Sequence, residues 1–438
     1  MVTPEWLPIR SAIRGINIVN TRHHMAQPKR CRPVGTERTA PGQWRRQALR
    51  VLRPTSKWWL LATCIGLTAA APASAESAWK LSAEYVADVS GAVSGGTSKS
   101  GRALDNLLID LDGDLERAFG WSGASVHVSL LNNTGGQPNE IAGTLQGVDN
   151  IEVTRPRGKI YEAWIEQKIG AASVRVGLYD LNSEFYANDA AGLLISPAFG
   201  IGSELAATGP NGPSIFPSTS PAVRLRVAPS ESFYVQAAAL GAMAGVVGDP
   251  GGVHLNLDDG ALVIAEGGWT GRGKVAVGAW RYTRRQDSLF DLDASGQPAK
   301  RTAVGAYLLV EQPLVGQDGD VRALTGFLRV GFSDGQTTPF NGGTQIGVLV
   351  NRVFEGRPDS ALSFGLNEGR LSSDFRRDLR AGGGQAARAE YYAELTYADQ
   401  ITDRVSLQPS FQYVVNPGGD RRAHDALVVT LRARVKLH

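Results

Sequence analysis

Apolar and polar residues alternate with period two along the stretch DALVVTLRARVKLH at residues 425–438. Every second residue from Leu427 onward is apolar, and Arg432, Arg434 and Lys436 occupy three of the positions between. This period indicates a strand whose two faces meet different environments, but strands of soluble sheets are usually about five or six residues long. A tilted strand that crosses a bilayer needs about 9–11 residues. The stretch therefore predicts a membrane-spanning strand, and a long edge strand of a soluble sheet is the alternative.

The beginning of the chain differs from the rest. Residues 1–57 carry twelve Lys and Arg against two acidic residues, and the run WWLLATCIGLTAAAPASAES follows. Cations, a short apolar run and a final ASA form the pattern of a secretory signal peptide. We predict that residues 1–75 are a basic leader and signal peptide that is removed, and that residues 76–438 form one barrel domain. The sequence LATC offers a lipoprotein site at Cys64 as the alternative, which Thr63 before the cysteine disfavours.

The charge balance changes once this leader is set aside. The whole chain has 45 Lys and Arg and 42 Asp and Glu, so the part after residue 75 has 33 and 40 and a formal net charge of −7. Both cysteines lie in the leader. Composition therefore gives no support to nucleic-acid binding, and the exported domain must be stabilised without disulfides.

The same alternation recurs along the rest of the chain, bounded by Gly, Asp, Asn and Pro turns. It predicts about sixteen strands. Their ranges are 80–89, 104–113, 123–131, 159–169, 172–179, 222–229, 232–243, 260–270, 272–283, 302–312, 322–333, 343–354, 359–369, 388–398, 404–415 and 425–438. Tight links such as 170–171 alternate with long ones such as 132–158, 180–221 and 284–301.

An even number of strands joined in this way is typical of bacterial outer-membrane barrels. Because unpaired backbone groups are costly in hydrocarbon, such a sheet must close on itself. The predicted fold class is all-β: a transmembrane antiparallel β-barrel with long external loops and an inward-folded constriction loop.

Aromatic residues near the ends of the predicted strands suit the interfacial girdles of such barrels. They are Trp79, Trp121, Tyr179, Trp269, Tyr282, Tyr307 and Tyr413. In this register Val429 and Leu431 face lipid, so replacing either by Arg is expected to cost about 2–4 kcal/mol near the bilayer midplane. The same register places Arg432 in the water-filled interior, so Arg432→Ser is expected to be tolerated.

Motifs that would indicate catalysis or metal binding are incomplete. GWTGRGKV at 268–275 matches a phosphate-binding loop until Val275, which replaces the Ser or Thr that holds Mg²⁺, and its place between two alternating runs favours a hairpin turn. DLDASG at 291–296 begins like a calcium loop but has Thr302 where the bidentate Glu belongs, so only weak calcium binding stays open. None of the histidines lies in a GxSxG or HExxH motif, and His127 falls in the lumen-facing phase of its strand. We predict no enzyme activity, no catalytic residue, no metal site and no cofactor.

The candidate functional site is the polar inner face of the predicted barrel. A loop as long as 180–221 is usually functional, and folded inward it would place charges and aromatic rings at a constriction. Sugar hydroxyls bond to arginines and carboxylates, and sugar C–H faces stack on aromatic rings, so this lining suits carbohydrate. The predicted lining residues are Glu162, Glu166, Lys168, Arg175, Glu184, Phe185, Phe199, Arg224 and Arg226. A surface loop over a pore without preference is the alternative.

Several stretches resemble the carbohydrate-selective porins of the OprB type. They are DLERAFGW (114–121), EAWIEQKI (162–169), VRVGLYDLNSEF (174–185), SPAFG (196–200) and LTYADQITDRVSLQPSFQYVVNPGG (395–419). The resemblance implies an outer-membrane barrel of about sixteen strands, often a homotrimer, that passes glucose and other monosaccharides down a gradient without cofactor. Expected partners are monosaccharides, outer-membrane lipid and lipopolysaccharide, and the barrel-assembly machinery. The chain departs from the usual pattern at its end, where Leu437 replaces a lipid-facing aromatic residue and His438 is an extra residue.

Two other functions fit the same pattern. A general, non-selective porin shares every architectural feature and differs only in its selectivity. A soluble exported β-protein that binds polysaccharide shares the signal peptide and the alternation, but it would partition into the aqueous fraction.

Overall fold

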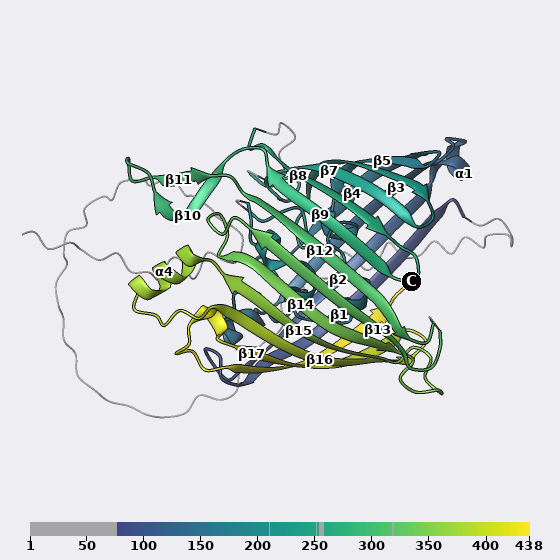
Figure 1. The fold of residues 1–438 in the computed structure, drawn as a ribbon. Helices are drawn as coiled ribbons and strands as arrows, with labels where there is room; N and C mark the ends of the chain where they lie inside the picture. The colour runs from purple at the N-terminus through teal and green to yellow at the C-terminus, as the bar shows by residue number, and fades with distance from the viewer. Residues whose placement is uncertain (1–76, 210, 251, 254–257, 318) are drawn as a thin grey trace, which may run out of the picture. The chain divides into compact units, whose positions relative to one another are not determined.

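Sixteen antiparallel strands form a closed barrel in a computed structural model, which describes residues 77–438 except 210, 251, 254–257 and 318 (Figure 1). The predicted leader and signal peptide, residues 1–75, lie outside the described residues. The barrel strands are β1 (Trp79–Ser94), β2 (Gly101–Asp114), β3 (Ala124–Gly135), β4 (Arg157–Ile169), β5 (Ala172–Tyr179), β6 (Ser220–Ser230), β7 (Phe233–Gly241), β8 (Ala261–Trp269), β9 (Lys274–Tyr282), β12 (Val304–Val315), β13 (Ala323–Ser333), β14 (Phe340–Asn351), β15 (Ala361–Leu371), β16 (Ala389–Thr402), β17 (Val405–Val415) and β18 (Ala426–Lys436).

The last strand closes the barrel against the first. Val89 of β1 pairs with Leu431 of β18, and the neighbouring pair is Asp88 with Arg432. Each of the sixteen predicted ranges overlaps one barrel strand, so the predicted fold class is confirmed. The sequence analysis missed the hairpin β10 (Gln286–Leu292) and β11 (Pro298–Arg301), which lies within the predicted loop 284–301 and forms a separate two-stranded sheet.

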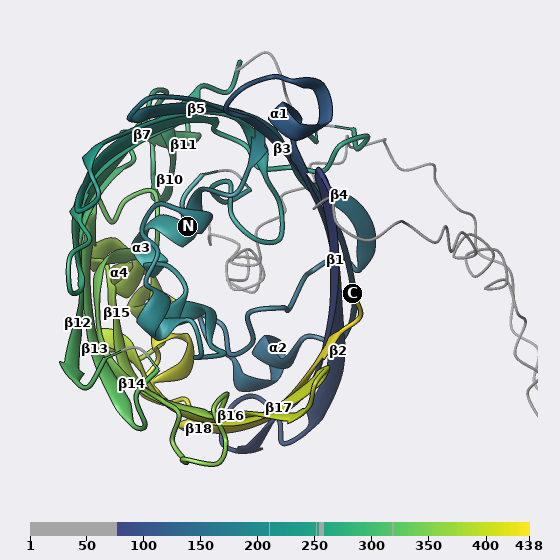
Figure 2. The same ribbon diagram turned by 90° about the vertical axis from the view of Figure 1, so that its right-hand side faces the viewer.

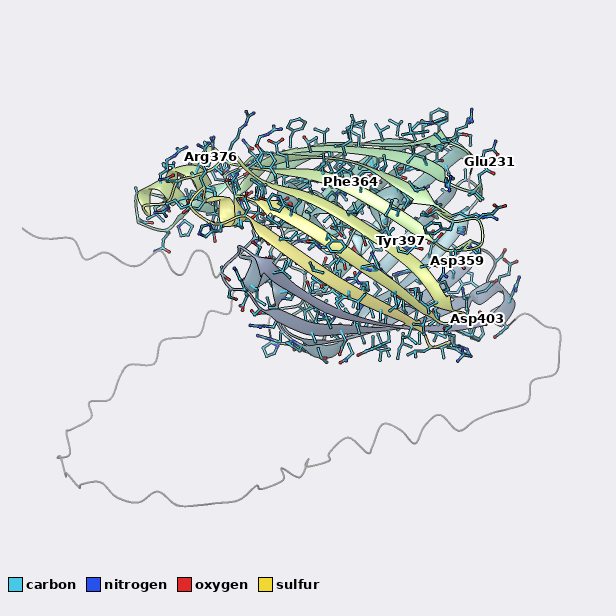
Figure 3. The ribbon with its side chains drawn as sticks, turned by 90° about the horizontal axis from the view of Figure 1, so that it is seen from below. Glu231, Asp359, Phe364, Arg376, Tyr397 and Asp403 are labelled. Carbon is cyan, nitrogen blue, oxygen red and sulfur yellow. The ribbon has the colours of Figure 1, made fainter. Side chains whose placement is uncertain are left out.

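Short and long connections lie at opposite ends of the barrel. The turns near Glu231, Asp359 and Asp403 share one end, whereas Arg376 of α4 lies at the other (Figure 3). Outer-membrane barrels have short periplasmic turns and longer extracellular loops, so we call the end with α4 the outer end.

The helices of the described residues are short and lie in connections. They are α1 (Leu115–Phe119), α2 (Pro138–Ala142), α3 (Ser203–Ala206) and α4 (Ser373–Ala381), with 3-10 turns at Leu181–Ser183, Asp189–Ala191, Pro197–Phe199 and Pro417–Gly419. None of these helices is long and apolar enough to span a membrane.

The two faces of the wall differ as the period-two pattern predicts. Outward residues such as Val277 and Leu431 are exposed and apolar. One expectation was wrong: Tyr179, Tyr282 and Tyr307 do not form an outer girdle but are buried inside the barrel. The register explains this, because each lies in the inward phase and packs under a loop that sequence alone does not place.

Two long connections fold into the barrel. Figure 2 looks at the barrel from the end opposite α4 and shows α2 and α3 inside the ring of strands. They belong to the segments 136–156 and 180–219, which join β3 to β4 and β5 to β6. The predicted inward folding of the long segment after β5 is therefore confirmed.

Candidate functional site

The segment 180–219 packs against the inner wall through apolar side chains. Phe185, Tyr186 and Leu205 of this segment share one buried cluster with wall residues of β7 to β9 and β12. The wall residues are Ala238, Leu240, Leu262, Ile264, Ala276, Trp280, Tyr282, Tyr307 and Leu309. Tyr186 stacks on Tyr307 with ring centroids 3.8 Å apart. Burial of apolar area thus holds the segment against this side of the barrel.

Buried carboxylates of the wall accept hydrogen bonds from the backbone of this segment. Glu266 of β8 accepts from the Tyr186 N–H at 3.0 Å, and Glu311 of β12 accepts from the Asp189 N–H at 2.7 Å. Glu394 of β16 accepts from the N–H groups of residues 195 and 196 at 2.6 and 2.9 Å. A loop without regular structure needs partners for its backbone groups, and these carboxylates supply them.

Arginine and glutamine side chains of the wall donate hydrogen bonds to carbonyl oxygens of the same segment. Arg329 of β13 donates to the carbonyl oxygens of Phe199 and Gly200 at 2.9 Å each, and it also reaches the Ala198 carbonyl at 3.2 Å. Gln345 of β14 donates to the same Ala198 carbonyl. We call the inward faces of β12 to β16 the loop-bonding wall, because their polar side chains bond to loop backbone.

Glycines of the loop-bonding wall make room for this approach. A Cβ atom at Gly331 would lie 1.9 Å from a carboxylate oxygen of Glu204, and one at Gly365 would lie 2.6 Å from the ring of Phe199. Tyr186 donates to Glu204 at 2.5 Å, and burial of Glu204 raises its pKa. Larger side chains at these two inward positions would force the loop away from the wall.

The segment 136–156 is held in the same manner. Glu390 of β16 accepts from the backbone N–H groups of residues 145 and 146 at 2.9 and 3.1 Å. Arg432 of β18 donates to Asn150 at 2.7 Å and to Asp88 of β1 at 2.6 Å. Arg432 is buried, so the expectation that Arg432→Ser is tolerated loses its basis: the side chain holds a loop and neutralises a buried carboxylate.

On β4 to β6 the inward charges pair with one another instead. Arg175 of β5 lies 2.7 Å from Glu166 of β4, and Arg224 of β6 lies 3.2 Å from the same carboxylate. Glu184 lies in the first part of the loop after β5. Its carboxylate accepts a hydrogen bond from Arg224 at 2.8 Å and lies 3.6 Å from Arg175. Two cations and two anions form this cluster, so its net charge is zero. We call the inward faces of β3 to β6 the ion-pair wall.

Aromatic and acidic groups continue from the charge cluster toward β3 and β2. The guanidinium of Arg175 lies 3.8 Å from the ring centroid of Trp164, and His127 stacks on Trp164 at 5.0 Å. His127 also contacts Asp112 at 2.8 Å through its Nδ1. The prediction that His127 is a wall residue in the lumen-facing phase is confirmed by this geometry.

Other predicted lining residues lie near this cluster. Glu162 accepts from the backbone N–H of Asp180 at 3.0 Å, and Arg226 donates to Gln236 at 2.8 Å. Lys168 is exposed on β4. Burial, together with the nearby Glu162 carboxylate, raises the pKa of Asp180 to about 7.

The two predicted phenylalanines lie elsewhere. Phe185 and Phe199 are fully buried between the loop and the wall, so neither ring is available to a solute in this structure. Their apolar faces pack the loop against the barrel. The sequence shows that the segment 180–200 contains aromatic rings. It does not show that these rings pack against the apolar inner wall of the barrel.

The geometry adds residues that the sequence analysis did not select. Trp164 and Tyr179 lie among the predicted charges, and the Tyr179 hydroxyl donates to Glu184 at 2.6 Å. Both lie in the inward phase of their strands, which was the available signal. Arg157 forms two hydrogen bonds of 2.6 Å to Asp249 near the outer end, and Arg157 lowers the pKa of Asp249.

A metal centre has no support in the part of the chain that the structure describes. Within it, no group of three or more His, Cys, Asp or Glu side chains is placed to hold a metal ion.

Comparisons with known proteins agree with this architecture. Residues 98–437 match the family described as carbohydrate-selective porin, OprB family. The chain is 22% identical to Porin B of Pseudomonas aeruginosa over 401 residues, which cover 82% of this chain and 87% of that protein. A high-pH structure of Pseudomonas putida OprB superimposes with a TM-score of 0.73 at 22% identity, covering 82% of this chain and 94% of that one. The outer-membrane channel DcaP of Acinetobacter baumannii gives a TM-score of 0.51 at 12% identity, covering 82% and 97% of the two chains.

Proposed function

Because the chain belongs to the OprB family of carbohydrate-selective porins and is an outer-membrane channel, we propose that it passes monosaccharides such as glucose into the periplasm by passive diffusion. The channel assignment favours transport over catalysis. The observation that carries the proposal is the neutral cluster of Glu166, Arg175, Glu184 and Arg224 on the ion-pair wall.

The chemistry of this cluster suits an uncharged, hydroxyl-rich solute. A carboxylate accepts hydrogen bonds and a guanidinium donates several, so a sugar that leaves bulk water can replace both kinds of bond along one wall. Since the cluster has no net charge, it gives a small ion no strong attraction. His127 and Asp112 add further hydrogen-bonding groups beside the cluster.

Among the predicted residues, we assign the lining to Glu162, Lys168, Arg175, Glu184 and Arg226. Glu166 and Arg224 are buried, and they act by holding Arg175 and Glu184 in place. Phe185 and Phe199 act through the position of the loop, because their rings are buried. Trp164 supports the guanidinium of Arg175 by stacking. Its indole thereby fixes a hydrogen-bond donor at a constant place on the wall.

The remaining expected partners belong to the same proposal. Export through the N-terminal signal peptide, insertion by the barrel-assembly machinery and contact with lipopolysaccharide all follow from the outer-membrane location. Assembly as a homotrimer is proposed from the family resemblance. The apolar outward residues, such as Val277 and Leu431, support the lipid contacts.

Liposome swelling tests the proposal directly. The purified mature protein is reconstituted, and swelling is compared for glucose, arabinose, an amino acid and a disaccharide at equal osmolarity. Fast swelling for the monosaccharides alone is the expected result. Equal rates for all small solutes would instead identify a general porin, the second candidate function.

A double variant links the result to the cluster. Glu166→Gln with Glu184→Gln leaves Arg175 and Arg224 without their carboxylates, so we expect the channel to gain a preference for anions. Asp287→Asn is the control, because Asp287 and its partner Lys300 lie on the hairpin β10–β11, which is a separate sheet from the barrel wall. An unchanged reversal potential in the double variant would remove the cluster from the conduction path.

A further inference from the structure

A cation that forms no ion pair with the described residues interrupts the apolar outward face of the barrel near its outer end. The outward residues of β9 are Val275, Val277 and Ala279, and the next in the same phase is Arg281. Arg281 pairs across the sheet with Val263 of β8. On its other side it pairs with Val304 of β12, and both valines are exposed. A guanidinium thus emerges from a lipid-facing apolar surface.

Two more arginines follow directly in the chain. Arg284 and Arg285 are exposed between β9 and β10. No carboxylate of the described residues forms an ion pair with any of the three. The nearest acids in the sequence have other partners, since Asp287 pairs with Lys300 at 2.5 Å and Asp291 with Arg301 at 3.2 Å.

An outward arginine on β15 forms an ion pair within the protein and serves as a comparison. Arg370 of β15 also lies near the outer end, and Glu368, two residues before it, is 3.3 Å away. Among the described residues Arg281 has no such ion pair, and its cross-strand partners are valines. Within the described residues the three arginines thus have no carboxylate partner, and their exposed guanidinium groups are free to bind an anion from outside the chain.

The place of the three arginines identifies that anion. An arginine at the edge of the hydrocarbon extends its charged end to the headgroup layer, where it lowers its energy by pairing with anionic groups. Guanidinium groups match phosphate oxygens in a bidentate geometry. We propose that Arg281, Arg284 and Arg285 form a binding site for the phosphate groups of the outer-leaflet glycolipid, lipopolysaccharide.

This site is independent of the solute that the channel carries. Arg281 faces outward, whereas the residues of the ion-pair wall face inward, so the two sets lie on opposite faces of the barrel. The inference deepens the proposed contact with lipopolysaccharide and rests on the proposed function only for the outer-membrane location. Its failure would leave sugar transport untouched.

The test is a titration of the mature protein in detergent micelles with purified lipopolysaccharide. The variant is Arg281→Gln, Arg284→Gln, Arg285→Gln. Each basic residue near an anionic membrane surface is worth about a fivefold change in affinity, so the triple variant is expected to bind on the order of a hundredfold more weakly. Lipopolysaccharide whose phosphates have been removed is expected to show the same weak affinity for the wild type and for the triple variant.

The matched control removes equal charge at the opposite end of the barrel. Arg272→Gln, Arg404→Gln, Lys436→Gln changes exposed residues beside short turns and the end of β18, and its affinity is expected to stay within about twofold of the wild type. Unchanged swelling rates show that both triple variants are folded. Equal affinity of wild type and outer-end variant, or an equal loss in the control, would overturn the proposal. Competition by millimolar inorganic phosphate would also overturn it, in favour of a free-phosphate site.

Discussion

The loop-bonding wall and the ion-pair wall carry similar inward residues but use them differently. On β12 to β16, Glu390 and Glu394 have no exposed surface and bond to loop backbone. At the ion-pair wall, the Arg175 side chain of β5 is 13% exposed and Glu184 of the inward loop is 19% exposed, and both bond to charged side chains. The same period-two pattern of charge therefore serves to hold a loop on one side and to meet the lumen on the other.

The difference follows from what each wall must satisfy. A loop brought into a barrel exposes backbone N–H and C=O groups that have lost water, and an unmade bond there costs about 1–3 kcal/mol. Isolated Glu, Gln and Arg side chains can each serve such groups. On the ion-pair wall the charges neutralise one another, and Arg175 and Glu184 keep partial contact with solvent. Charge on an inner face is thus not by itself evidence of a pore lining.

The largest effect is expected at Arg432, which lies where a loop meets the closing pair of strands. Arg432→Ser leaves Asp88 and Asp149 buried without their common cation, since Arg432 lies 2.6 and 3.5 Å from them. Breaking a buried pair in this way costs about 3–5 kcal/mol. Urea unfolding in micelles should show this loss of unfolding free energy. Arg432→Ser combined with Asp88→Asn should recover part of it, and a single variant as stable as the wild type would contradict the buried pairing.

A smaller loss of unfolding free energy is expected at Arg329, which bonds to loop carbonyl oxygens instead of carboxylates. Arg329→Met removes the donor to the carbonyls of Phe199 and Gly200. We expect a loss of about 2–3 kcal/mol, because at least one carbonyl stays unsatisfied, and faster cleavage by chymotrypsin after Phe199. Limited proteolysis of the inserted protein measures the second effect.

Arg226→Met is the control for this loop release. Arg226 donates to the side chain of Gln236 on the neighbouring strand, so its loss removes no bond to loop backbone. Proteolysis of the control should match the wild type. If both variants are cut at the same rate, the bonds from Arg329 do not hold the loop.

The barrel itself could be predicted from sequence because its signal is local. Alternation such as that from Leu427 to Leu437 defines each strand and its outward face. Short turns show which strands are neighbours in the sheet. The hairpin β10–β11 lacks this signal, because its two strands are only seven and four residues long. Its existence depends on pairing between Gln286 and Arg301 that no periodicity marks.

The candidate site could be predicted only in part, because loop contacts are non-local. The inward phase correctly brought Glu166, Arg175 and Arg224 together, since they lie on neighbouring strands. It could not show that Phe185 and Phe199 are buried. A usable signal was present in the inward glycines of β13 to β15, such as Gly331 and Gly365, which leave space where a loop packs.

A pH-dependent difference is expected at the start of the inward loop. Burial raises the pKa of Asp180 to about 7, above its ordinary value of 3.8, so the folded protein binds this proton more tightly than the unfolded chain. The stability from this group is therefore present at low pH and is lost as the pH rises from about 4 to about 7. The full shift corresponds to at most about 4 kcal/mol, and partial solvent contact reduces the expected difference to about 2 kcal/mol.

Asp180→Asn tests this dependence and keeps the local structure. The amide oxygen can still accept from the Asn182 N–H, as the carboxylate does at 2.8 Å. The unfolding free energies of the two proteins should be similar at pH 4, and the variant should be the more stable at pH 8. Parallel curves across this range would show that Asp180 is ionised in the folded barrel.

The smallest effect is expected at Arg434, two residues after Arg432 and in the same inward phase. Arg434 lies 3.1 Å from Glu84, and both side chains are 38% exposed. Ion pairs in contact with solvent are worth about 0–1 kcal/mol and weaken with salt. Arg434→Ser should therefore change the unfolding free energy by less than about 1 kcal/mol, and less in 1 M than in 0.05 M salt. Because strand, phase and residue type are the same at both positions, a loss as large as that of Arg432→Ser would show that loop cover does not separate the two kinds of inward charge.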